Sequence, residues 1–123
     1  KILLHFKKDY QKIKNNYIND IYRFTKAFNT EKNIDSKINC AIVLEDQYSS
    51  FLKEFSNFKI PRFIEDLYNY ESEHLGYEKQ IYKGYSLLAD VDKLNNYSTQ
   101  SNLAHRNFIE GLDNLERSLK LVI

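Results

Sequence analysis

The sequence predicts an all-α fold, an antiparallel three- or four-helix bundle with long, coiled-coil-like helices. Apolar residues recur at alternating steps of three and four along most of the chain, which is the periodicity of amphipathic helices. Only one proline and three glycines interrupt the sequence, and the apolar–polar alternation typical of strands never persists. Because this length fits a single hydrophobic core, we expect residues 1–123 to form one helical bundle domain.

The first predicted helix covers residues 2–28 and carries the clearest apolar stripe. Its inward positions are Leu3, Phe6, Tyr10, Ile13, Tyr17, Ile21, Phe24 and Phe28. The polar run NTEKNIDS, residues 29–36, is predicted to be a loop. Asp35 or Ser36 is expected to cap the second helix, because either side chain can accept a hydrogen bond from a free N–H group at a helix start.

The second predicted helix extends to about Phe58, and Pro61 then marks a sharp boundary because proline suits only the first turn of a helix. A third helix is expected from Pro61, but residues 61–96 could form one helix or two, with Gly84 as the expected position of a break. The run NNYSTQSN, residues 95–102, is predicted as a loop or polar turn with Ser98 or Thr99 as cap. A fourth helix follows it.

Polar residues interrupt the apolar face of the third predicted helix at Glu71, His74 and Glu78. The Glu71-x-x-His74 spacing is that of dimetal sites in four-helix bundles, but such sites need two of these pairs and two further glutamates. His105 has no glutamate three residues before it, and His5 has none either. A single zinc site is disfavoured because further histidines or cysteines are lacking nearby in the sequence. We therefore predict no metal and no cofactor.

Two other interpretations of this segment remain. Glu71, His74 and Glu78 could hydrogen-bond to tyrosine hydroxyls, lysines or water between helices, because buried polar groups must be paired; this is the interpretation we favour. Alternatively, the face could be open and bind a partner, since aromatic residues are enriched at interfaces. The expected contact residues are then Tyr70, Tyr77 and Tyr82.

Catalytic motifs are absent from the sequence. It contains no G-x-S-x-G, P-loop, H-E-x-x-H or zinc-knuckle pattern. The lone cysteine, Cys40, lies within an apolar stripe, where a buried structural thiol is expected rather than a nucleophile. No uncharged run approaches the roughly 20 residues of a membrane span. Because methionine is missing, we expect a fragment or processed product, from which a targeting segment could have been removed.

Charge is distributed unevenly along the chain. Residues 1–30 hold seven basic and two acidic side chains, whereas residues 60–97 hold four basic and seven acidic ones. The basic residues expected on the outer face of the first helix are Lys1, Lys8, Lys12, Arg23 and Lys26. Such a face could attract an anionic membrane surface. Nucleic acid is disfavoured, because base recognition relies on arginine and this face has only Arg23.

These lysines have a simpler explanation as well. Lys, Asn, Ile, Tyr and Phe are abundant and Gly, Ala, Arg and Pro are scarce, which is the bias of an AT-rich genome. Lysines at solvent positions would then carry little functional information. We expect a non-enzymatic helical interaction domain, an adaptor or assembly module, that binds another protein or itself through an aromatic helix face. The alternative is a peripheral membrane-binding bundle that uses the basic first helix.

Overall fold

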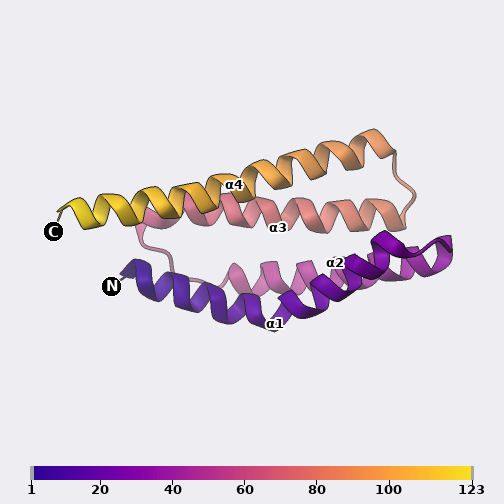
Figure 1. Ribbon diagram of the computed structural model, residues 1–123, viewed down its shortest axis with the longest axis horizontal. Coiled ribbons are helices and arrows are strands. Elements are labelled where there is room, and N and C mark those ends of the chain that lie inside the picture. The colour runs from indigo at the N-terminus through magenta and orange to yellow at the C-terminus, as the bar shows by residue number, and fades with distance from the viewer. Residues whose placement is uncertain (1, 123) are drawn as a thin grey trace.

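The computed structural model describes residues 2–122 as an all-α bundle of four helices, with the side chains described through residue 120. In chain order the elements are α1 (Ile2–Thr30), α2 (Ile34–Phe55), the 3-10 turn η1 (Arg62–Ile64), α3 (Glu65–Ser86) and α4 (Val91–Val122). Consecutive helices run antiparallel, so both ends of the chain lie at the same end of the bundle (Figure 1). The predicted fold class is therefore confirmed.

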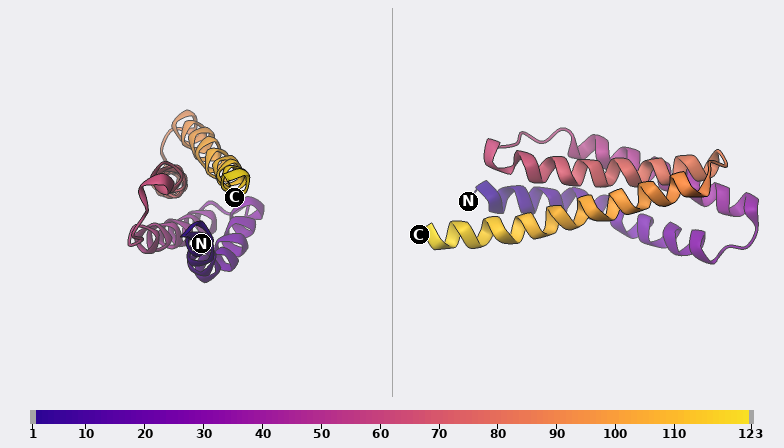
Figure 2. Two further views of the ribbon diagram at one scale, coloured as in Figure 1. Left: turned by 90° about the vertical axis from the view of Figure 1, so that its left-hand side faces the viewer. Right: turned by 90° about the horizontal axis from the view of Figure 1, so that it is seen from above.

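Short polar connections explain why neighbouring helices pack in chain order. α2 packs along α1, α3 packs along α2, and α4 packs along α3. α1 and α4 are not packed closely along each other, and Figure 2 shows the four helices viewed from the end of the bundle. One contact between α1 and α4 is the ion pair between Lys7 and Glu116. Gly111 lets α4 approach α3 closely, because a Cβ there would overlap the side chain of Leu67.

The helix boundaries correct four predictions. α2 ends at Phe55 and not at about Phe58. α2 begins before the predicted caps, and its N-cap is Asn33, whose side-chain oxygen accepts a bond of 3.1 Å from the Ser36 N–H group. α3 begins at Glu65 rather than at Pro61, because η1 forms the first turn after the proline. Residues 95–102 are not a loop, since they lie inside α4 and the packing of α4 on α3 outweighs their weak helix preference.

The expected break near Gly84 is present. α3 ends at Ser86, and the Ala89 N–H group bonds back to the Gly84 carbonyl at 2.8 Å. Leu88 adopts the left-handed conformation, with φ of 58°, that commonly ends a helix. Residues 61–96 therefore belong to two helices and not to one rod.

The core is built mainly from aromatic rings. The Tyr10 ring lies 5.5 Å from that of Phe55 and 5.3 Å from that of Phe108, so one tyrosine of α1 contacts both α2 and α4. Phe55 is fully buried and stacks on Tyr68 at 4.6 Å. These large side chains fill the space between α1 and α4, and each aromatic pair adds about 0.5–1.5 kcal/mol beyond its buried area.

Two residues of α2 test this packing on opposite faces of one helix. Leu44 is fully buried, whereas Ile42 is exposed. We expect Leu44→Ala to lower the free energy of unfolding by about 2–5 kcal/mol, because it empties a core site. Ile42→Ala should change it by less than about 0.5 kcal/mol. Urea denaturation measures both, and equal losses for the two variants would contradict the assigned orientation of α2.

Candidate functional site

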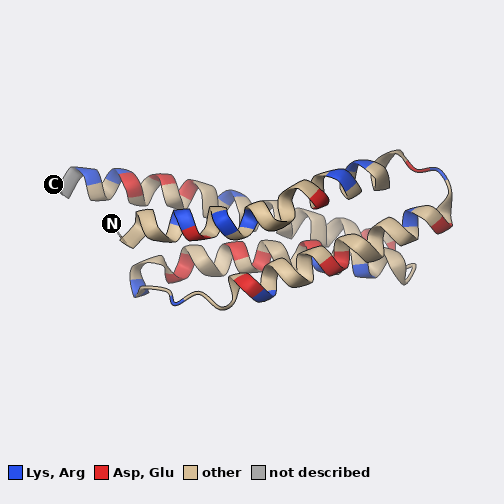
Figure 3. Ribbon diagram, turned by 90° about the horizontal axis from the view of Figure 1, so that it is seen from below, with Lys and Arg blue, Asp and Glu red and all other residues tan. Residues whose placement is uncertain are grey.

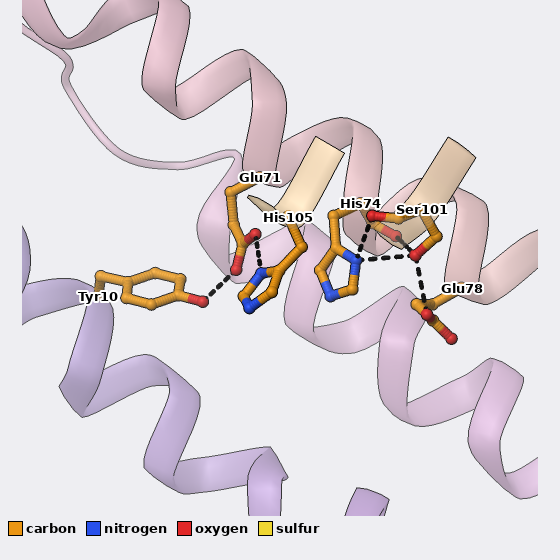
Figure 4. Close-up of polar contacts among 6 residues, drawn as sticks. All are labelled: Tyr10, Glu71, His74, Glu78, Ser101 and His105. Atoms are coloured by element: carbon orange, nitrogen blue, oxygen red, sulfur yellow. Dashed lines mark hydrogen bonds and ion pairs between the residues drawn. The ribbon is translucent and has the colours of Figure 1, made fainter. Parts of the chain in front are cut away.

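Six polar residues meet inside the bundle and are termed the polar cluster: Tyr10, Glu71, His74, Glu78, Ser101 and His105 (Figure 4). Helical periodicity explains their arrangement, because residues three or four apart share one face of a helix. α3 supplies Glu71, His74 and Glu78, and the antiparallel α4 supplies Ser101 and His105. Tyr10 reaches the cluster from α1, so three helices meet here.

Glu71 is the most deeply placed charged residue of the cluster, with 1% of its surface exposed. Its Oε2 atom accepts a hydrogen bond from the Tyr10 hydroxyl, and its Oε1 atom lies 2.9 Å from His105 Nδ1. A buried carboxylate without partners would cost several kcal/mol. The two contacts therefore compensate the burial and connect α3 to both α1 and α4.

A second chain of hydrogen bonds starts at His74. Its Nδ1 atom lies 3.1 Å from the Ser101 carbonyl oxygen and 2.8 Å from Ser101 Oγ. The Ser101 hydroxyl donates to Glu78 Oε1 at 2.8 Å. Because a carbonyl oxygen can only accept, the proton of neutral His74 is assigned to Nδ1, and Nε2 then carries a free lone pair.

The two histidines have opposite pKa shifts. The pKa of His105 is raised above its ordinary value of 6.5, chiefly by the hydrogen bond to Glu71, although burial acts in the other direction. The pKa of His74 is lowered, chiefly by burial, and the charges of Glu71 and Glu78 only partly offset this. Burial, followed by the charge of Glu71, also raises the pKa of the Tyr10 hydroxyl. His105 is therefore the favoured site for a proton, and His74 is kept neutral.

The cluster borders a small cavity between the helices, termed the central cavity. Its volume is about 130 Å³, and Lys14, Tyr48 and Phe51 line it together with Tyr10, Glu71, His74 and His105. Glu71, His74 and His105 each offer a ligand atom, and these atoms lie within 4.8 Å of one another. Nitrogen and carboxylate oxygen are the donors that zinc and related cations use.

Sequence reasoning placed Glu71, His74 and Glu78 on one buried face, and the structure places them there. It did not find His105, which supplies the second imidazole from a different helix. The sequence did carry a weak signal, because His105 lies one helical turn from Ser101 and beside the buried Ala104 and Phe108. A single metal site was disfavoured for want of further histidines, and α4 supplies one in His105.

The three predicted contact tyrosines do not form one surface. Tyr82 is 8% exposed and stacks on Tyr48 at 5.9 Å, so it is a core residue and cannot act as a surface contact in this structure. Its position follows from α2 and α1 packing over that end of α3. Tyr77 is half-buried, with its ring 6.1 Å from that of Tyr97, and Tyr70 is exposed.

The predicted basic residues lie on the surface of α1. Lys8, Lys12, Arg23 and Lys26 are exposed, and Figure 3 shows basic residues along this helix. Arg23 also pairs with Asp20 at 3.2 Å. Lys1 lies outside the described residues. Cys40 is half-buried rather than fully buried, and it forms no disulfide.

Comparisons with known proteins identified no relative. No family model matches the sequence, and neither the curated proteins nor the solved structures that were searched gave a significant match. Among the described residues, no helix is both long and apolar enough to cross a membrane. Function must therefore be inferred from the side chains themselves.

The histidine shifts predict a maximum of stability near pH 6.5. Above that value folded His105 holds a proton that the unfolded chain has lost, so the free energy of unfolding falls as pH rises through the folded pKa of His105. Below it the unfolded chain protonates His74 while the folded chain does not, so the free energy falls again as pH drops.

Urea denaturation between about pH 5 and about pH 9 measures this profile. His105→Asn should remove the decline on the alkaline side, and His74→Asn should remove the part of the acid decline that His74 causes. Ile42→Ala, at an exposed residue that does not titrate, should leave the profile unchanged. An unchanged alkaline side in His105→Asn would contradict the assignment of the proton to the His105–Glu71 pair.

Proposed function

We propose that this protein is a non-enzymatic helical assembly module that binds a second copy of itself through an aromatic face of α3. That surface, termed the α3 outer stripe, consists of Tyr70 and Tyr77 of α3 together with Phe63 of the preceding turn η1, at seven-residue spacing. The observation that carries the proposal is that Phe63 and Tyr70 remain 49% and 37% exposed, whereas Tyr68, Tyr82 and Tyr85 pack toward the core. Exposed aromatics at helical spacing are suited to contacting another helix.

Charge complementarity supports a second copy as the partner. The α3 outer stripe is flanked by the exposed acidic residues Glu65, Asp66 and Glu73. The outer face of α1 exposes Lys8, Lys12 and Lys26. Opposite charges on two faces favour their encounter and fix how they align. Each copy thus carries both an acidic aromatic face and a basic face that matches it.

The arrangement of the helices also indicates the type of assembly. α1 packs mainly along α2 and meets α3 through side chains such as Phe28, so the basic face of α1 and the α3 outer stripe are two different surfaces. Contact between α1 of one copy and α3 of the next is then head-to-tail, and such contacts generate chains or rings rather than a closed pair. We expect association to continue beyond the dimer as concentration rises.

A peripheral membrane-binding role is the second candidate, and the observation that favours it is the exposed row of Lys8, Lys12, Arg23 and Lys26. Lysines near an anionic surface each contribute about 1 kcal/mol, so four basic residues could give measurable binding. The same lysines would take part in both self-association and membrane binding. The aromatic residues of α3 would take part only in self-association.

Sedimentation at increasing protein concentration tests the assembly. Tyr70→Ala combined with Tyr77→Ala should weaken association by about fivefold or more, because contact tyrosines are often worth more than 1 kcal/mol. Lys8→Glu with Lys12→Glu should weaken it too, and adding Glu65→Lys and Glu73→Lys should restore it. Ile42→Ala, an equally exposed residue on α2, is the control and should have no effect.

Circular dichroism must show that each variant remains folded. A wild-type chain that stays monomeric at all concentrations would contradict the proposal. Association that is equally strong in the tyrosine variant would contradict it as well. Pelleting with vesicles of anionic and of neutral lipid separates the second candidate. Binding to anionic vesicles that depends on Lys8 and Lys12 but not on Tyr70 would favour the membrane role.

A further inference from the structure

The polar cluster contains three side chains that can act as metal ligands, and hydrogen bonds do not occupy all of their lone pairs. Glu71, His74 and His105 come from two helices, and one ligand atom of each lies within 4.8 Å of the others. Glu71 Oε1 and His105 Nδ1 are 2.9 Å apart. Donors around a tetrahedral zinc ion, at about 2.0–2.1 Å from the metal, are about 3.3 Å from one another. Binding zinc therefore requires the 2.9 Å separation to lengthen slightly and any longer separation to shorten by at most about 1.5 Å.

Both imidazoles have an atom available for a cation. The bond from His74 Nδ1 to the Ser101 carbonyl leaves Nε2 unprotonated, and metal-bound histidines use this same arrangement, with the second nitrogen donating to a carbonyl or carboxylate. His105 gives its Nδ1 proton to the contact with Glu71, and a cation placed between the two would replace that proton.

Glu71 is held in position for such a role. Its Oε2 atom accepts the Tyr10 hydroxyl bond, so the carboxylate is oriented while Oε1 faces the histidines (Figure 4). Hydrogen-bonded ligand carboxylates of this kind are common in metal sites. Glu71 is almost fully buried, whereas the His105 side chain is 38% exposed, so a cation could enter the site from the solvent beside His105.

The surroundings allow a cation and a water molecule. The central cavity of about 130 Å³ borders all three donors and has room for a water at an open coordination position. The nearby charges are mixed, since Glu78 lies beyond His74 and Ser101, and Lys14 lines the cavity. Two carboxylates against one ammonium leave an excess of negative charge when both imidazoles are neutral.

We propose that Glu71, His74 and His105 form a binding site for one divalent transition-metal cation of the zinc type, with a water from the central cavity as the fourth ligand. Two imidazoles and one carboxylate suit zinc and its first-row neighbours, whereas magnesium and calcium prefer sites made of oxygen atoms. We assign a single ion, because these three residues are the only such group among the side chains described, residues 2–120. The inference is independent of self-association.

The test uses the whole chain after exhaustive treatment with a chelator. Equilibrium dialysis against Zn²⁺ followed by metal analysis should find one ion per chain, and added Zn²⁺ should raise the melting temperature by mass action. Co²⁺ should give the visible absorption of a four-coordinate site. His74→Gln and His105→Gln should each lose stoichiometric binding, the temperature shift and the Co²⁺ spectrum.

The matched controls are His5→Gln, at the only other histidine, and Glu73→Gln, at an exposed carboxylate of α3. Both should bind as the wild type does. Because Glu71→Gln changes a buried group, its loss of binding counts only if circular dichroism shows a folded bundle. A wild-type chain without stoichiometric Zn²⁺, or binding that survives in both His74→Gln and His105→Gln, would overturn the proposal.

Discussion

The burial of the Glu71 carboxylate is the constraint on which the rest of the bundle depends. A charged group that is 1% exposed must be paired. Tyr10 of α1 and His105 of α4 are the partners that contact Glu71. With an apolar core alone, the four amphipathic helices could slide along one another and pack in several different registers. These directed contacts favour one register of α1 and α4 relative to α3.

The aromatic core and the polar cluster are connected, because Tyr10 belongs to both. α1 and α4 are too far apart for small aliphatic residues to bridge, and Tyr10 spans the gap with its ring on Phe55 and Phe108 and its hydroxyl on Glu71. The amphipathic tyrosine thus contributes both apolar contact and a hydrogen bond. The remaining space is the central cavity, which lies where the aromatic packing and the polar groups meet. The same features that align the helices therefore create the proposed cation site.

Local patterns in the sequence predicted most of the fold but less of the site. The stripe from Leu3 to Phe28 specifies α1, and Pro61 and Gly84 mark two chain reversals, because each effect acts within a few residues. The run at residues 95–102 was misassigned because its propensity is weak and α3 stabilises it as helix. Tyr82 and His105 could not be placed for a related reason. Which tyrosine is covered, and which histidine meets Glu71, depends on how α1, α2 and α4 pack around α3.

The coupling between Tyr10 and Glu71 tests the central claim most directly. A double-mutant cycle with Tyr10→Phe, Glu71→Leu and the combined variant, followed by urea denaturation, isolates the interaction, because leucine cannot accept the hydroxyl bond. If the buried carboxylate aligns α1 with α3, the cycle should give a stabilising coupling of about 0.5–3 kcal/mol. A coupling indistinguishable from zero, with all variants folded, would show that the helices align without this contact and would contradict the account.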